Sequence, residues 1–311
     1  MKLLRLLPCL LAISLLGAEP KKPDYDSQYV LGPDSQEKAG VPKGTVTEYE
    51  MADSKAFPGF GRKWALYVPK QYDPTKEACL MVFQDGLGYA SRNGQWRVPV
   101  VFDNLIAQGK MPVTIALFIN PGFIPDPKNP KGKDKKGRPL GKSNRSFEYD
   151  SVTDLYPKFL VEEMIPLAES KGVKISKDPL RRAIAGSSSG GICAFNAAWQ
   201  RPEAFSKVFT TIGSFTNIRG VISKGVEKGG NLYPQMIMDS PKKNIRVFSQ
   251  DGIHDLTNEF GVWPEANQKM ADAWKAKGYD YKFIMGEGTH NGRHGAQLLP
   301  EAMTWLWRDI R

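Results

Sequence analysis

The sequence predicts an α/β fold with a mostly parallel central sheet, an antiparallel start and helices on both faces. From Gly44 onward, short apolar strand-like runs alternate with helix-like segments, which is the pattern of strand–helix–strand units. The first two strand-like segments alternate polar and apolar residues with a period of two, as antiparallel strands do. No internal repeat is present, which excludes solenoids and propellers.

The expected strands differ in how deeply they are buried. After the first two, most of them are short continuous apolar runs typical of central strands. In chain order the strands are expected at 44–51, 63–69, 78–86, 113–120, 181–186, 208–215, 244–252 and 279–288. Helices are expected at 101–109, 154–172, 190–200, 264–278 and 298–310. The segments together predict a single domain over residues 44–311.

The first 18 residues have the layout of a secretory signal peptide. Lys2 and Arg5 precede an apolar run that ends in small residues, so we expect cleavage near Ala18 and a secreted or periplasmic protein. A lipid anchor on Cys9 is the alternative, but a charged region and an apolar core would then have to fit into eight residues. No later segment approaches ~18 uninterrupted apolar residues, so no stable membrane insertion is expected.

Residues 19–43 are rich in Pro, Lys and Asp and predict a linker followed by an extended arm that needs no core of its own. The cysteines beyond this arm are Cys79, in an apolar run, and Cys193, in a glycine-rich stretch. Two buried free thiols are expected at these positions. A small domain held together by disulfides is excluded.

The chain carries a formal net charge of +10, and much of the excess is local. Residues 128–145 contain eight basic residues and one acid, interleaved with Gly and Pro. A solvated surface loop is the first interpretation, and steering of an anionic polymer is the functional alternative. Nucleic acid is not expected as a partner, because the run lacks interleaved aromatic residues and the protein is expected to be exported.

The stretch IAGSSSGGICAF, residues 184–195, contains the pattern G-x-S-x-G between an expected strand and an expected helix. A nucleophile on such a sharp turn has a strained backbone, and side chains two residues before and after it would collide. Gly186 and Gly190 remove that collision, which indicates the middle serine, Ser188, as the nucleophile. The alternative is a Gly/Ser-rich helix start without chemistry.

A serine nucleophile needs a base, and the sequence has three histidines, all after Ser188. On an elbow of this kind, the usual chain order is nucleophile, acid, histidine, with the histidine after the last strand. His290 directly follows the last expected strand and fits best. His294, before the closing helix, is the alternative, and His254 comes too early.

The acid is expected after the preceding strand. Asp251 stands at the end of that strand, where a turn or capping role explains it, whereas Asp255 lies in a loop able to reach over the strand ends. We favour Asp255, with Asp251 second and Glu259 a remote third. The acid would fix the histidine tautomer and stabilise the imidazolium.

Two backbone N–H groups are expected to bind the oxyanion of a tetrahedral intermediate. One belongs to Ser189, directly after the nucleophile, and the other to Leu87, where Gly86 lets the chain turn after strand 78–86. A metal is not expected: His290 and His294 are four residues apart, but no HExxH or paired-cysteine motif accompanies them. No other cofactor is implied.

Residues 44–310 resemble the esterase group of the α/β-hydrolases. This group includes feruloyl and acetylxylan esterases of carbohydrate esterase family 1, enterochelin-type trilactone esterases, S-formylglutathione hydrolase and the mycolyltransferases. The resemblance rests on five segments: VFQDGLG, RSFEYD (145–150), GSSSGG, DGIHDL and GTHN. It implies an α/β-hydrolase fold and supports Ser188, Asp255 and His290, with Leu87 and Ser189 as oxyanion donors. Ser189 replaces the family's commoner methionine, and Thr289 replaces the glycine before its histidine.

The sequence therefore predicts a secreted serine carboxylic-ester hydrolase. Feruloyl or acetyl esters on a polysaccharide are the expected substrates, because export suits polymer breakdown. The first alternative is a siderophore trilactone esterase, in which the basic loop would attract the anionic catecholate substrate. The second alternative is a non-catalytic protein that binds glycan or a partner protein. Trp96 and Trp263 are candidates for stacking on sugars, although packing in the core is the stronger expectation.

Overall fold

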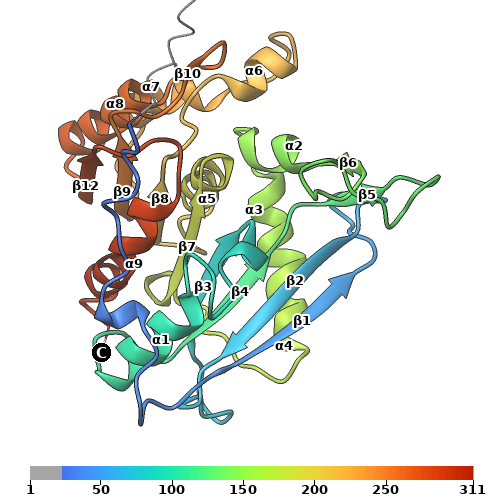
Figure 1. Cartoon of the computed structure of the whole chain (residues 1–311). Coiled ribbons are helices and arrows are strands. Elements are labelled where there is room, and N and C mark those ends of the chain that lie inside the picture. The colour runs from blue at the N-terminus through green and yellow to red at the C-terminus, as the bar shows by residue number, and fades with distance from the viewer. Residues whose placement is uncertain (1–22, 311) are drawn as a thin grey trace, which may run out of the picture.

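The computed structural model describes residues 23–310, and an eight-stranded sheet runs through the centre of this part (Figure 1). The strand order is β1-β2-β4-β3-β7-β8-β9-β12. β2 pairs antiparallel with β1 and with β4, and every later pair is parallel, so the expected mostly parallel sheet is confirmed. The strands are β1 Thr45–Met51, β2 Arg62–Val68, β3 Cys79–Gln84, β4 Thr114–Ile119, β7 Arg182–Ser187, β8 Lys207–Thr211, β9 Arg246–Gly252 and β12 Asp280–Gly286.

Helices cover both faces of the sheet because the central strands are apolar on both sides. In β3, Leu80 and Val82 join one core cluster while Met81 and Phe83 join the other, as alternating side chains must. The helices of the first face are α3 Leu155–Phe159, α4 Ile165–Glu169, α5 Ser189–Gln200, α7 Tyr233–Asp239 and α8 Trp263–Ala276; those of the second are α1 Val98–Ala107 and α9 Arg293–Leu306.

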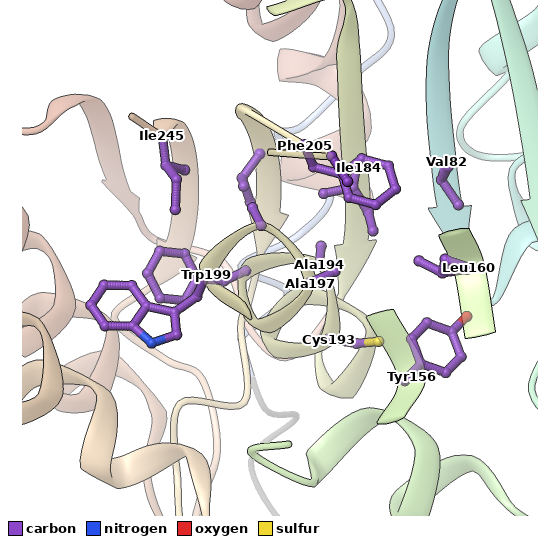
Figure 2. Close-up of a cluster of buried hydrophobic side chains, with 14 of the residues drawn as sticks. Val82, Tyr156, Leu160, Ile184, Cys193, Ala194, Ala197, Trp199, Phe205 and Ile245 are labelled. Carbon is purple, nitrogen blue, oxygen red and sulfur yellow. The ribbon is translucent and has the colours of Figure 1, made fainter. Parts of the chain in front are cut away.

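Figure 2 shows part of the first cluster. Cys193 and Ala194 of α5 pack among strand residues such as Val82 and Ile184, and Tyr156 of α3 closes the group. Cys193 is fully buried, and Cys79 is buried on the opposite face; both are free thiols, as expected. The small side chains of α5 allow this helix to pack closely on β7, which fixes the turn between them.

Two helices differ from the sequence expectation. The segment 154–172 is one continuous amphipathic pattern, yet α3 and α4 are joined by a π-helical turn, Leu160–Met164 (η3). Pro166 lacks an N–H and cannot donate the regular helical bond to the carbonyl four residues earlier, which explains the altered turn before it. The closing helix begins at Arg293, five residues before the expected start, and so includes His294.

Shorter elements follow the carboxyl ends of the strands or connect them. They are the hairpin β5 Phe123–Pro125 and β6 Gly141–Ser143, the strand pair β10 Thr257–Asn258 and β11 Gly261–Val262, the helices α2 Arg145–Asp150 and α6 Ile218–Ile222, and the 3-10 turns η1 Pro33–Ser35, η2 Gly86–Gly88, η4 Pro179–Arg181 and η5 Gly230–Leu232. η2, α2, α6 and β10 all follow the carboxyl ends of sheet strands along the chain. That edge is where open α/β sheets place their ligand sites.

The part of the arm that the structure describes, residues 23–43, lies along the domain. Asn104 of α1 donates from Nδ2 to the carbonyl oxygens of Asp34 (2.9 Å) and Gln36 (2.8 Å). Nearer the N-terminus, the ring of Tyr29 stacks on that of His294 in α9. The expected signal peptide, residues 1–18, and Cys9 lie outside the described residues. Within residues 23–310, no helix has the length and apolar character needed to cross a membrane.

Candidate active site

Ser188 occupies the sharp turn between β7 and α5. Its backbone has φ 59° and ψ −124°, a conformation that residues other than glycine rarely adopt. A Cβ at Gly186 would lie 2.2 Å from the carbonyl oxygen of Gly190, so the strand and helix can approach only without a side chain there. A Cβ at Gly190 would lie 3.2 Å from Cβ of Gln84, which is also tight. The local sequence thus places a strained serine on a half-buried turn.

The structure brings Ser188, His290 and Asp255 together. His290 Nε2 lies 2.8 Å from Ser188 Oγ, and its Nδ1 lies 2.6 Å from Asp255 Oδ1. Each residue follows the carboxyl end of a different strand: β7, β12 and β9. Because a carboxylate only accepts, the Nδ1–H donates to Asp255 and leaves the Nε2 lone pair facing the serine hydroxyl.

The other histidines and Glu259 lie elsewhere. His294 is 6% exposed in α9, where Nδ1 is 3.1 Å from Gln250 Nε2. His254 stacks on Tyr25. Glu259 is exposed in the turn between β10 and β11. None of these three side chains has a hydrogen bond to Ser188 in the described part of the chain. Residues 23–310 also contain no cluster of three or more His, Cys, Asp or Glu side chains that could hold a metal ion.

Asp251 lies near the end of β9 and has no hydrogen bond to His290 among the described residues. It accepts from the Gly252 N–H (2.9 Å) and from Asn267 Nδ2 (2.8 Å). Burial, followed by a hydrogen bond to Asp255 and the charge of that residue, raises the pKa of Asp251 to about 9. Asp255 Oδ2 is buried and has no other hydrogen-bond partner in the described part of the chain. A raised pKa keeps the Asp251 carboxyl neutral near pH 7, and in that form it can donate a hydrogen bond to the Asp255 carboxylate.

The raised pKa makes the free energy of unfolding depend on pH. The folded protein retains a proton on Asp251 that an unfolded chain releases above about pH 4. The retained proton contributes fully to the free energy of unfolding below about pH 4. This contribution is lost as the pH rises toward about 9, at no more than about 1.4 kcal/mol per pH unit. We expect the free energy of unfolding of Asp251→Asn, measured by urea unfolding, to decline less steeply with pH across this range than that of the wild type. Equal slopes in the variant and the wild type would contradict a protonated Asp251.

The two predicted oxyanion donors are backbone N–H groups that follow the carboxyl ends of the neighbouring strands β3 and β7. The N–H of Ser189 opens α5, at the positive end of the helix dipole, and has no hydrogen-bond acceptor within residues 23–310. The N–H of Leu87 in η2 donates to Asn120 Oδ1 at 3.1 Å. Gly86 is required here because a Cβ would lie 2.1 Å from the Ile119 nitrogen.

Two further side chains complete the surroundings of the nucleophile. Ser214 Oγ lies 3.2 Å from Ser188 Oγ and accepts from Trp263 Nε1, also at 3.2 Å. The indole of Trp263 meets His290 edge-on, with ring centroids 5.7 Å apart. Trp263 and Trp96 are only 2% and 8% exposed, so both pack in the core, which was the stronger expectation. No motif in the sequence marked Ser214.

Charged groups flank the site on the side of α2. Arg145 donates from Nη2 to Asp85 Oδ2 at 2.7 Å, directly before the Gly86–Gly88 turn. The remaining basic residues of 128–145 lie on the β5–β6 hairpin, which projects from the sheet edge (Figure 1). Within that hairpin Arg138 pairs with Asp134. The stretch is thus a surface hairpin that ends next to the oxyanion segment.

The strand order, with the serine on the turn after β7 and short elements after the strand ends, defines an α/β-hydrolase, as the motifs predicted. A sequence model of the family described as "Putative esterase" matches residues 56–291, most of the chain. The chain belongs to this esterase family. A search of curated protein sequences gave no match.

Solved structures share the fold at low sequence identity. A ferulic acid esterase has a TM-score of 0.65 at 18% identity, with 86% of this chain and 98% of its own covered. A CE1 ferulic acid esterase from the anaerobic fungus Anaeromyces mucronatus has a TM-score of 0.61 at 16% identity, with coverages of 91% and 94%. The enterobactin esterase of Shigella flexneri, crystallised with enterobactin, has a TM-score of 0.65 at 19% identity; 87% of this chain matches 60% of it. This chain therefore spans about three-fifths of the enterobactin esterases.

Proposed function

We propose that the protein is a secreted serine carboxylic-ester hydrolase that works through an acyl-enzyme. The observation that carries this proposal is the continuous hydrogen-bonded line from Ser188 Oγ through both nitrogens of His290 to Asp255. Nucleophile and base lie within reach of one another, and the acid orients the base. Secretion rests on the sequence of residues 1–18 alone.

The reaction follows from this arrangement. Ser188 Oγ attacks the ester carbonyl carbon while His290 Nε2 accepts the hydroxyl proton. The tetrahedral intermediate collapses, the same nitrogen returns the proton to the departing alcohol, and an acyl group remains on the serine. Water then attacks the acyl-enzyme while His290 Nε2 accepts its proton, the acyl–Oγ bond breaks, and Nε2 returns the proton to Ser188 Oγ as the carboxylic acid leaves. Asp255 holds the Nδ1–H and stabilises the imidazolium in both halves.

The oxyanion is assigned to the N–H groups of Ser189 and Leu87. The first has no acceptor among residues 23–310 and can donate from the start of α5. The second donates to Asn120 Oδ1, so the ester carbonyl oxygen has to replace this oxygen as its acceptor. Preorganised amide donors of this kind stabilise the intermediate more strongly than the substrate, because the negative charge develops only there.

Feruloyl or acetyl esters on a polysaccharide are the substrates we favour. Ferulic acid esterases match this chain over nearly their whole length, which supports a catalytic unit of the same extent. The trilactone alternative is supported by the fold of the enterobactin esterase and by the basic β5–β6 hairpin near the site. A non-catalytic binding role is disfavoured by the complete Ser188–His290–Asp255 line.

Comparing three substrates separates these functions. We expect the protein beginning at residue 19 to hydrolyse p-nitrophenyl acetate and methyl ferulate, and His290→Ala to reduce both rates by about 10³-fold or more. Activity confined to a catecholate trilactone would favour the siderophore branch, and cleavage of acetate alone would eliminate ferulate. Failure to hydrolyse all three, with no reaction with a fluorophosphonate, would favour the non-catalytic role.

A further inference from the structure

A short piece of the N-terminal arm, residues 24–29, lies on the two loops that carry Asp255 and His290. We call this piece the arm hook. Tyr25 stacks on His254, which directly precedes Asp255, with ring centroids 3.6 Å apart. Asp24 Oδ1 accepts from the backbone N–H of Asp26 at 3.1 Å and so stabilises the turn of the chain in the hook. The hook therefore reaches the acid loop and the histidine loop at once, although about 230 residues or more separate it from them in sequence.

The bonds to the histidine loop are directional. Asp26 Oδ1 accepts from the Thr289 N–H at 3.0 Å, and its Oδ2 accepts from the Thr289 hydroxyl. The Tyr29 hydroxyl oxygen accepts from the Glu287 N–H at 2.8 Å. The hook thus holds two of the three residues directly before His290, and Thr289 contributes both of its donors.

Two glycines leave space for the hook. A Cβ on Gly286, at the end of β12, would lie 2.5 Å from the Tyr29 hydroxyl. A Cβ on Gly288 would lie 3.2 Å from Asp26 Oδ1 and 3.3 Å from the Tyr29 ring. The arm hook therefore packs directly against the loop backbone at Gly286 and Gly288. A side chain at either glycine would collide with the hook or crowd it.

We propose that Asp26 and Tyr29 are positioning residues that hold the 286–290 loop so that His290 spans Ser188 and Asp255. The inference rests on the proposed esterase function. It also gives a physical reason for Thr289, which stands where the resembled esterases have glycine: its hydroxyl is the second donor to Asp26. The arm then acts on catalysis through loop geometry, without touching the substrate.

Asp26→Ala is expected to lower kcat for p-nitrophenyl acetate about 10- to 100-fold with KM within about twofold, because displacement of a catalytic group by about 1 Å costs up to ~10²-fold. The rate constant for inactivation by a fluorophosphonate should fall in the same proportion. Asp26→Asn should recover most of the loss, since its carbonyl oxygen still accepts from the Thr289 N–H. Tyr29→Phe, which deletes one hydrogen bond and keeps the ring, should give a smaller loss of the same kind.

Asp34→Ala is the matched control, because Asp34 lies on the same arm and bonds Gln108 and Lys38 away from the site. It should lower the free energy of unfolding and leave kcat within about twofold, since exposed polar pairs contribute modestly to stability. Wild-type kcat in folded Asp26→Ala, or an equal loss in Asp34→Ala, would overturn the proposal. Absence of esterase activity in the wild type would instead count against the proposed function.

Discussion

Replacing Ser188 with alanine is expected to reduce kcat for p-nitrophenyl acetate by at least about 10³-fold while KM changes little. The substitution removes the attacking oxygen and leaves the oxyanion donors and the ester contacts in place, so only their residual catalysis remains. The measurement is a steady-state rate for each variant at the same pH.

Ser187→Ala provides the matched control, since the chain offers adjacent serines. Ser187 Oγ lies 2.6 Å from Thr211 Oγ1 and has no hydrogen bond to His290 in the described part of the chain. We expect its removal to change kcat by less than about tenfold, the effect of a lost hydrogen bond near the site. Similar large losses in both variants would assign the effect to the turn and not to the Ser188 hydroxyl.

The second large effect is expected at the acid. Asp255→Asn should lower kcat by about 10⁴-fold, because the amide donates to Nδ1 and selects the tautomer whose Nε2 already carries a proton. Asp251→Asn should cost less than about tenfold, since its amide still donates toward Asp255 as the neutral carboxyl does. Both variants keep the side-chain shape, so steady-state kinetics compare charge and tautomer directly.

The contrast between the two asparagine variants also decides the assignment of the acid. A severe loss in Asp251→Asn with near wild-type activity in Asp255→Asn would make Asp251 the acid of the triad. The sequence favoured Asp255 but kept Asp251 as an alternative, because only four residues separate the two aspartates at the end of the same strand. The 2.6 Å contact between Asp255 and His290 depends on how β9 and β12 lie side by side, which no local pattern encodes.

The sheet and the elbow were predictable from sequence because their signals are local. Buried strands are short apolar runs, and the glycines at 186 and 190 bracket a serine between such a run and a helix. The contact of His290 with Ser188 agrees with the expectation from chain order, since His290 follows the last strand. The continuous pattern of 154–172 concealed the π-helical turn, because the buried residues Ile165 and Ala168 continue the apolar face on either side of the exposed Pro166.

Residues that act through distant contacts carried no such signal. Ser214 and Asn120 are single polar residues after strands, and only the fold brings them to Ser188 and Leu87. Asp26 lies in a polar arm whose composition indicated no core, yet it bonds Thr289 across the chain. Polar pairs of this kind depend on three-dimensional register, which hydrophobic periodicity does not determine.

Labelling with a fluorophosphonate, followed by peptide mass mapping, tests the nucleophile most directly. Such reagents phosphylate a serine oxygen that a neighbouring base has activated. We expect one adduct on Ser188, no adduct in Ser188→Ala and slow labelling in His290→Ala. An adduct on Ser187, Ser189 or Ser214, or a wild-type protein that does not react, would contradict the assignment of Ser188.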